Sequence, residues 1–353
     1  MGETRGYVHD LCAVDGVCVR NGEVESMTRT ARDELTIGTW NMWEHGMYPK
    51  RAGEHERYDR QARVMADQAP AHVWLLQEIG DAASFVALAE KLGMDCMAAA
   101  SGESATSPVF DPGGRGFGVG VMWDPAAGIT PVPGTLRVFT RDVFFHGVAS
   151  VVLDLGDDRL LHVASGHATP WGAPQNIAEA KRWVSIMTRP NRGLPAELAG
   201  RVLPGVLGTD SNAVTGDRVR REDGRWVYHA ADPFEGQEWI ADMVYQVPLP
   251  YERDERTGYP VPKADRGAGD VLWAGGLHDA TAVLGLPVAP TTGYHPVDPY
   301  GPRDLDHLRV NTALLGALAE VMVVDTEDVR ASSDHRPKQL TLRRSLIPRT
   351  IPS

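Results

Sequence analysis

The sequence predicts a layered α/β fold that is rich in β-sheet, and two patterns lead to this prediction. Short, nearly continuous apolar runs recur along the chain, and five separate polar clusters each follow such a run. Segments in which apolar residues recur at helical spacing separate several of these runs. Strands alternating with helices predict sheets that are covered by helices, with the polar strand ends gathered at one edge.

The predicted strands and helices follow one another from residue 35 onward. The strand-like runs cover residues 35–40, 71–78, 116–123, 142–155, 160–167, 202–212, 303–311 and 331–342. Helical spacing covers residues 57–68, 85–92 and 176–188. The run at 71–78 is almost entirely apolar until it reaches Gln77 and Glu78, which is typical of a strand buried on both faces.

Two parts of the chain do not fit this alternation. Residues 1–34 are polar and lack a strong period, so we expect an N-terminal extension outside a main domain over residues 35–345, with a tail over 346–353. Residues 215–270 are rich in Pro, Gly, aromatic and charged side chains, and are too long for an ordinary connection. We interpret this second segment as an insertion that forms a lid or wall at the site.

Composition and charge narrow the function classes. Apolar residues make up 42% of the 353 residues and charged residues 23%, which is typical of a globular protein. The formal net charge of −12 disfavours a non-selective, high-affinity nucleic-acid binder, because such proteins usually carry a basic surface. Only Cys12, Cys18 and Cys96 are present, at no metal-site or redox spacing. With no visible secretory signal or membrane-spanning run, a cytoplasmic protein without a membrane partner is expected.

Each polar residue at a strand end has an ordinary explanation when it is taken alone. Asn41 is most simply a turn residue, and Asp210 with Asn212 is most simply an Asx turn. Glu78 is most simply solvated or a helix cap, and His167 is only one of 12 histidines.

Taken together, the polar groups supply carboxylates, amides and imidazoles, which are the groups that hydrolysis of a phosphate ester requires. Carboxylate and amide oxygens hold hard cations such as Mg²⁺. A carboxylate or imidazole can orient and deprotonate water, and amide or imidazolium donors can meet the phosphoryl oxygens.

The order of the short motifs resembles that of the endonuclease/exonuclease/phosphatase superfamily, over roughly residues 35–342. The motifs are Thr39–Asn41 (TWN), Leu76–Glu78 (LQE), Gly166–Pro170 (GHATP), Asp210–Asn212 (DSN), Leu305–Leu308 (LDHL) and Ser333–Pro337 (SDHRP). The resemblance implies a DNase I-like α/β fold, a two-sheet α/β sandwich with helices on the outer faces. It also implies a metal-dependent phosphoesterase.

The resemblance assigns three residues to a metal site. Glu78 corresponds to the residue that binds the metal directly. Asn41 and Asp334 correspond to other residues of the metal site. The implied cofactor is Mg²⁺ or Mn²⁺.

The resemblance assigns five further residues to catalysis. His167 corresponds to an imidazole that donates to a phosphate oxygen or the leaving group. Asp210 and Asn212 correspond to the groups that orient water and the scissile phosphate. His335 contacts the phosphate or acts as base, and Asp306 sets its tautomer; whether Asp210 or His335 is the base stays open.

The sequence departs from the family pattern at two places. The usual G-D-x-N is one residue wider after Gly208, although the spacing from Asp210 to Asn212 is intact. His307 stands where a Tyr or an aliphatic residue is usual. It is either a substrate contact or an exposed strand residue, and we favour the exposed strand residue.

The sequence leaves two substrate classes open, a phosphorylated small molecule and a nucleic acid. Basic residues near the first motif and in the insertion favour a polyanion, but each group has acidic neighbours and the net charge favours a small or short substrate. Aromatic residues of the insertion could stack on a ring or form the core of the insertion. The alternative to an enzyme is a binding protein: a catalytically inactive member of the same fold that binds a phosphorylated ligand or a protein partner.

Overall fold

The computed structural model describes residues 33–96, 109–114, 116–139, 143–190, 194–196, 198–248, 250–296 and 298–350. Residues Glu34–Ser353 form one compact unit. The predicted extension over residues 1–34 lies outside the described residues except at its last two positions, so it stays a prediction. Among the described residues, no helix is both long enough and apolar enough to cross a membrane.

The first sheet has six strands in the order β14-β15-β1-β2-β4-β3 within the described residues. The strands are β1 Glu34–His45, β2 Val73–Ile79, β3 Phe110–Asp111, β4 Gly118–Trp123, β14 Leu318–Val323 and β15 Lys338–Arg343. β1 and β2 pair in parallel, whereas the other neighbours are antiparallel.

The second sheet has seven strands within the described residues, in the order β12-β13-β9-β8-β7-β5, and β6 also pairs with β7. The strands are β5 Thr130–Pro131, β6 Arg137–Val138, β7 Gly147–Asp154, β8 Leu160–His167, β9 Gly205–Asp210, β12 Leu277–Asp279 and β13 Asp306–Asn311. β8 and β9 are parallel, so both sheets contain one parallel pair whose carboxyl ends meet at the same sheet edge.

The two sheets pack face to face over the main apolar core. Successive residues of a strand point to opposite faces, so Val73 and Leu75 of β2 enter the core between the sheets. Trp74 and Leu76 of the same strand point to the outer face of the first sheet. Both faces of β2 are therefore covered, which explains why its sequence is continuously apolar.

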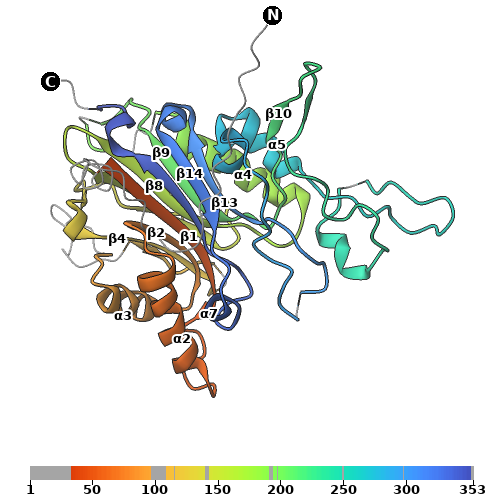
Figure 1. The fold of residues 1–353 in the computed structure, drawn as a ribbon, viewed down its shortest axis with the longest axis horizontal. Coiled ribbons are helices and arrows are strands. Elements are labelled where there is room, and N and C mark those ends of the chain that lie inside the picture. Colours follow the sequence, from red (N-terminus) through yellow and green to blue (C-terminus); the bar gives the residue numbers. More distant parts are fainter. Residues whose placement is uncertain are drawn as a thin grey trace, which may run out of the picture. The chain divides into compact units, whose positions relative to one another are not determined.

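Helices cover the outer face of each sheet (Figure 1). The helices are α2 Glu54–Arg63, α3 Ala82–Leu92, α4 Ala173–Thr188, α5 Gly267–Ala274, α6 Ala280–Val283 and α7 Glu327–Arg330. Side chains of α2, its π-helical continuation Val64–Gln68 and α3 pack on the first sheet, and those of α4 and α5 pack on the second. The predicted two-sheet α/β sandwich with outer helices is confirmed.

The structure differs from the expected elements in the last part of the chain. The strand expected over residues 331–342 begins only at Lys338, because a turn precedes it and Pro337 cannot donate to a sheet ladder. β14 was not expected from the sequence. It is an edge strand: five of the six residues in LAEVMV are apolar, but all six are half-buried or exposed.

The segment that was expected to be an insertion has a small core of its own. It contains the hairpin β10 Arg218–Arg220 and β11 Trp226–Tyr228, and a 3₁₀ turn over Ala241–Tyr245. Phe234 and Met243 are fully buried in its apolar cluster, against which Trp239 and Tyr251 pack. These two aromatic residues therefore serve the core of the insertion, and its last expected residues already belong to α5.

A buried ion pair fixes the start of this segment to the second sheet. Arg309 Nη1 of β13 lies 2.6 Å from Asp217 Oδ2, and both side chains are almost fully buried. Asp217 Oδ1 also accepts a hydrogen bond from the backbone N–H of Asp279. The pair joins the chain just after β9 to the strand that carries Asp306 and His307.

Asp217→Ala is expected to lower the free energy of unfolding by about 3–5 kcal/mol, because Arg309 would be left buried without its charge partner. Chemical denaturation measures this change. Asp223→Ala serves as the control, because Asp223 pairs with Arg225 at the surface and should leave stability nearly unchanged. Equal effects of the two substitutions would contradict the anchoring role of Asp217.

Candidate active site

A row of polar residues crosses the second sheet at one edge. In the strand registers, His167 at the end of β8 lies opposite Asp210 at the end of β9. Asp210 in turn lies opposite Asp306, the first residue of β13. Pairing of three neighbouring strands thus brings together residues that are far apart in the sequence.

The first sheet contributes Asn41 and Glu78 to the same place. Asn41 lies opposite Gln77 in the parallel pair of β1 and β2, so Glu78 follows directly beside it. Asn41 Nδ2 donates to Glu78 Oε1 and to Asp210 Oδ2, at 2.9 Å in both cases. The amide of Asn41 therefore links a carboxylate of the first sheet to a carboxylate of the second.

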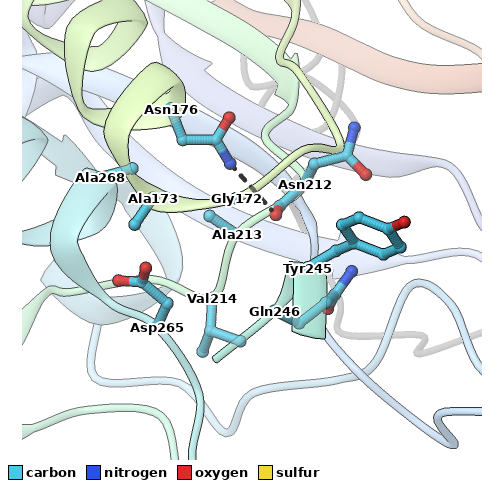
Figure 2. A pocket seen from close by; sticks show the side chains of 10 residues that line it. All are labelled: Gly172, Ala173, Asn176, Asn212, Ala213, Val214, Tyr245, Gln246, Asp265 and Ala268. Atoms are coloured by element: carbon cyan, nitrogen blue, oxygen red, sulfur yellow. Dashed lines mark hydrogen bonds between the residues drawn. The ribbon is translucent and has the colours of Figure 1, made fainter. Parts of the chain in front are cut away.

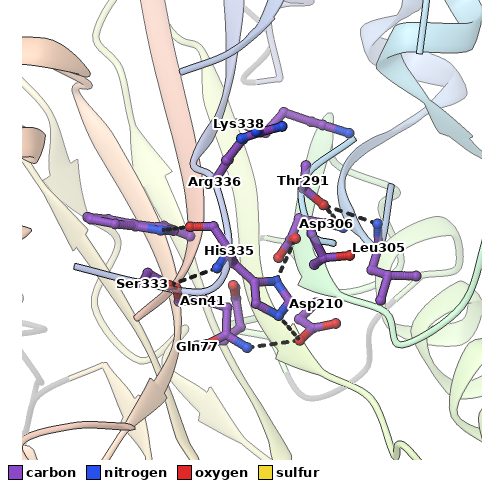
Figure 3. A network of polar contacts seen from close by, with 12 residues as sticks. Asn41, Gln77, Asp210, Thr291, Leu305, Asp306, Ser333, His335, Arg336 and Lys338 are labelled. Atoms are coloured by element: carbon purple, nitrogen blue, oxygen red, sulfur yellow. Dashed lines mark hydrogen bonds and ion pairs between the residues drawn. The ribbon is translucent and has the colours of Figure 1, made fainter. Parts of the chain in front are cut away.

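The turn before β15 places His335 over this row (Figure 3). Its backbone C=O accepts a hydrogen bond from Trp40 Nε1, and Ser333 Oγ donates to the C=O of Asn41. Its ring Nδ1 lies 2.7 Å from Asp306 Oδ2, and its Nε2 lies 3.8 Å from Asp210 Oδ2. The imidazole is therefore held between two carboxylates of the second sheet.

His167 faces the same carboxylates from the other side. Its Nε2 lies 3.4 Å from Asp210 Oδ2 and 4.0 Å from Glu78 Oε1. The ring of His146 stacks on it with a centroid separation of 4.0 Å and an interplanar angle of 15°. Burial lowers the pKa of His167, so its imidazole is neutral at neutral pH.

Glu78 and Asn212 both adopt left-handed backbone conformations that non-glycine residues seldom take. The φ angles are 55° for Glu78 and 44° for Asn212. The N–H of Asn212 donates to Asp210 Oδ1, and its Nδ2 donates to the C=O of Ala168. Strained residues of this kind cluster at functional sites, where the surrounding contacts hold them in place.

The charges of the site set the protonation of His335 and Asp210. Burial alone would lower the pKa of His335, but the carboxylates of Asp306 and Asp210 outweigh it and raise that pKa well above the usual range. Burial alone would raise the pKa of Asp210, but His335 and His167 outweigh it and lower that pKa. At neutral pH the site therefore holds an imidazolium at His335 beside a carboxylate at Asp210.

The remaining carboxyls fit a cation. Burial, followed by the charge of Asp334, raises the pKa of Glu78 to about 8, and burial also raises the pKa of Asp334. Among the described residues, Glu78, His167 and Asp210 each present a ligand atom within 4.8 Å of the others, a set that shares only Glu78 with the three residues predicted to hold the metal. Buried carboxyls whose negative charges repel one another are the donor set that a divalent cation would relieve.

Metal affinity is expected to increase with pH. Because Glu78 must lose its proton to bind a cation, the affinity for Mn²⁺ should rise about tenfold per pH unit below about pH 8 and level off above it. Calorimetry in buffers of different ionisation enthalpy measures both the affinity and the released proton. Glu78→Gln should weaken binding and abolish the proton release; a pH-independent affinity in the wild type would contradict this prediction.

The structure brings all eight predicted site residues into one cluster. Direct contacts join Asn41, Glu78, Asp210, Asn212, His167, His335 and Asp306. The negative charge of Asp334 raises the pKa of Glu78, and Asp334 directly precedes His335 in the same turn. Their individual roles stay predictions.

Two further residues at the site were not identified from the sequence. His146 stacks on His167, and the register that places its neighbour Gly147 opposite His167 explains the contact. Glu179 of α4 accepts the backbone N–H groups of Thr169 and Phe145 and so fixes the loops that flank His167. In the sequence, His146 is marked only as a polar residue within an apolar run, and Glu179 only as an acidic residue within a helical pattern.

The preferred interpretation of His307 as an exposed strand residue is wrong. The side chain is fully buried, because the chain that follows β9 covers this face of β13. Its Nδ1 lies 2.7 Å from Asp279 Oδ2, and its Nε2 lies 3.2 Å from the C=O of Ala213. His307 therefore ties the loop after Asn212 to the second sheet.

No protein-family model matches the chain, and no curated protein matches its sequence. Solved structures do match its fold. An endonuclease/exonuclease/phosphatase from Bacteroides vulgatus has a TM-score of 0.54 and 12% identity, and covers 88% of this chain and 98% of its own.

Two further matches carry more specific names. A mannosyl-6-phosphatase from Bacteroides thetaiotaomicron has a TM-score of 0.50 and 14% identity, with 87% of this chain and 98% of its own covered. A 3′ phosphatase from Neisseria, bound to a product DNA hairpin, has a TM-score of 0.50 and 16% identity, with the same coverage of 87% and 98%. The chain has the α/β sandwich fold of the endonuclease/exonuclease/phosphatase superfamily.

Proposed function

We propose that this protein is a divalent-metal-dependent phosphoesterase that hydrolyses a phosphate ester by direct attack of water. The observation that carries the proposal is the contact set around Asp210. Asn41 donates to its carboxylate, while His167 and His335 approach the same oxygen to within 3.4 and 3.8 Å. A buried carboxylate between two imidazoles and an amide suits a site that handles a water molecule and an anionic phosphoryl group.

Glu78, Asp334 and Asn41 are the residues that would hold the metal, with Mg²⁺ or Mn²⁺ as the cation. When bound, the cation supplies charge stabilisation for the phosphoryl oxygens and polarises the attacked ester. Asn41 keeps Glu78 and Asp210 at a fixed separation through its two hydrogen bonds. The N–H of Glu44 donates to Glu78 Oε2 and so orients that carboxylate further.

Asp210 orients the attacking water and accepts its proton. Its lowered pKa keeps it ionised at neutral pH, whereas the raised pKa of His335 keeps that residue protonated. This difference favours Asp210 over His335 as the base. Asn212 is held beside Asp210 by its backbone hydrogen bond and would help to orient the same water.

The two imidazoles act as donors to the phosphate. His335 is fixed through Nδ1 by Asp306, so its Nε2–H faces the centre of the cluster. His167 is neutral and turns Nε2 toward the same centre. In the transition state, Nε2–H groups at both positions would stabilise the phosphoryl oxygens, and one of them would protonate the leaving oxygen.

A small phosphorylated molecule fits the charge distribution better than a long nucleic acid. Two of the basic residues near the first motif form close ion pairs with carboxylates: Arg57 lies 2.5 Å from Glu54, and Arg60 lies 3.0 Å from Glu56. Arg218 in the insertion pairs with Asp270 at 2.8 Å. Paired cations leave little net charge for the several phosphates of a polynucleotide. The names of the structural neighbours include both a sugar phosphatase and a phosphatase bound to DNA, so the fold alone does not discriminate.

The test is hydrolysis of a substrate panel with Mg²⁺, with Mn²⁺ and with EDTA. The panel holds single- and double-stranded DNA, RNA, bis-p-nitrophenyl phosphate, p-nitrophenyl phosphate, nucleotides, inositol phosphates and sugar phosphates. His335→Ala serves as the blank. We expect metal-dependent hydrolysis that the variant loses, with small substrates preferred over polynucleotides. Absence of hydrolysis together with thermal stabilisation by a phosphorylated ligand would instead favour the inactive, ligand-binding alternative.

A further inference from the structure

Polar residues on the outer face of β13 bind the chain before and after β9. Asn311 Nδ2 donates to the C=O of Leu203, just before β9, at 2.7 Å. Arg309 forms its ion pair with Asp217, which follows β9. His307 lies on the same face at the catalytic end of β13, because side chains alternate along a strand. It contacts the loop after β9 close to the catalytic cluster.

Hydrogen-bond acceptors face both ring nitrogens of His307. Nδ1 lies 2.7 Å from Asp279 Oδ2, and Nε2 lies 3.2 Å from the C=O of Ala213. The side chains of His307 and Asp279 are at most 2% exposed, and a carboxylate buried this deeply needs a cationic partner. Lys338 is that partner for the neighbouring Asp304, at 2.6 Å, whereas His307 is the cation that contacts Asp279. The contacts therefore fit an imidazolium that donates to the carboxylate from Nδ1 and to the carbonyl from Nε2.

The carbonyl of Ala213 lies next to Asn212 of the catalytic cluster, in the loop after β9 (Figure 2). Asn212 has a left-handed backbone with a φ of 44°, a conformation that persists only where neighbouring contacts hold it. Its Nδ2 donates to the C=O of Ala168 at 3.0 Å, and Asn176 Nδ2 points to its C=O at 3.5 Å. These contacts hold Asn212 from the loop after β8 and from α4, and His307 holds the peptide that follows it.

Ser211 also contacts the carbonyl of Ala213, but it cannot replace the hydrogen bond from His307. Its Oγ lies 2.8 Å from the C=O of Ala213 and 2.9 Å from the C=O of Leu305. A hydroxyl has one proton to donate, so one carbonyl receives it at a time. His307 supplies a donor to Ala213 in either orientation of that hydroxyl. Without it, the Ala213 carbonyl would compete with Leu305 for the single proton of Ser211.

We propose that His307 is a positioning residue that keeps Asn212 in the conformation in which it orients the attacking water at Asp210. The Nε2–H of His307 fixes the peptide after Asn212, and Asp279 fixes the ring through Nδ1. This inference rests on the proposed function, since it connects His307 to the water that Asp210 and Asn212 handle there.

Two variants that imitate different ring nitrogens of His307 test this role. The amide nitrogen of Gln reaches as far along the side chain as Nε2, whereas that of Asn reaches as far as Nδ1. Each change is combined with Asp279→Asn, which removes the buried carboxylate charge and keeps the oxygen that accepts the N–H of Thr281. His307→Gln with Asp279→Asn therefore keeps a donor for Ala213, and His307→Asn with Asp279→Asn does not.

The His307→Gln pair should retain a kcat for p-nitrophenyl phosphate within about threefold of the wild type, whereas the His307→Asn pair should lose about tenfold or more. In an Asn212→Ala background the two pairs should have the same kcat, because the residue through which His307 acts has been removed. Asn311→Ala, at the far end of β13, controls for a loss of stability alone and should leave kcat unchanged. Equal kcat for the two pairs, or a difference that persists with Asn212→Ala, would overturn the inference.

Hydrogen exchange separates this inference from the proposed function. The backbone N–H of Asn212 donates to Asp210 Oδ1 at 3.0 Å, so its exchange rate reports the conformation of the loop without any turnover. Exchange should be slow in the wild type and the His307→Gln pair, and about tenfold faster in the His307→Asn pair. This pattern in a protein without metal-dependent hydrolysis would overturn the proposed function and keep His307 as the anchor of Asn212. Hydrolysis by the wild type, with equal exchange and equal kcat in the two pairs, would overturn the role of His307 alone.

Discussion

Asp210→Asn is expected to reduce kcat for phosphate-ester hydrolysis by about 10³-fold or more. A positioned general base contributes roughly 10²–10⁴-fold to a rate, and an amide cannot take the proton of the attacking water. The substitution also removes the negative charge between His167 and His335, at 3.4 and 3.8 Å. Steady-state kinetics with a saturating divalent cation measures the loss.

The same variant should remain folded. Asn keeps an oxygen that can accept the N–H of Asn212, and the change removes one buried negative charge near Glu78. We therefore expect a melting temperature close to that of the wild type. Asp223→Asn, at an exposed residue, controls for the chemical change alone. Turnover by Asp210→Asn within about tenfold of the wild type would contradict the assignment of Asp210 as the base.

Asp306→Asn is expected to have the second largest effect, with kcat falling by about 10²–10³-fold. Asp306 Oδ2 lies 2.7 Å from His335 Nδ1, accepts its N–H and stabilises the imidazolium, in which Nε2–H faces the cluster. An Asn side chain in this place offers only a neutral hydrogen bond to the ring, so it stabilises the imidazolium less. It also removes the largest of the charges that raise the pKa of His335.

The pH dependence distinguishes this role from a purely structural one. If protonated His335 is the active donor, kcat declines as pH rises through its pKa, and Asp306→Asn should move this decline to lower pH. His335 has a folded pKa above its unfolded value of about 6.5, so its contribution to stability is complete below pH about 6.5. That contribution is lost as pH rises through the raised folded pKa. An unchanged alkaline limb in the variant would count against the pairing of Asp306 with His335.

Local patterns were sufficient to predict the elements that place the site. The apolar run at residues 160–167 predicts a strand that ends at His167, and β8 spans Leu160–His167. The run that ends at Glu78 predicts a buried strand, and β2 ends one residue later at Ile79. These predictions succeed because both strands are covered on both faces, so burial shows directly in the sequence.

Contacts between distant strands could not be predicted in the same way. The register that places Asp306 opposite Asp210 depends on pairing between strands almost a hundred residues apart. His307 was assigned to the surface because the loop that covers it, at Ala213, is remote in the chain. The stacking of His146 on His167 likewise follows from the register of β7 and β8. In each case the sequence specifies the residue type, whereas long-range pairing decides its environment.

The most direct test of the central claim is metal-dependent hydrolysis of p-nitrophenyl phosphate by the wild type and by Glu78→Gln. Both proteins are treated with EDTA, freed of it, and titrated with Mn²⁺. We predict that the wild type is inactive in EDTA and regains activity as Mn²⁺ is added, and that Glu78→Gln recovers little activity even at high Mn²⁺. Equal activity of the wild type with EDTA and with Mn²⁺, or an identical titration curve for Glu78→Gln, would contradict a metal-dependent phosphoesterase site at this cluster.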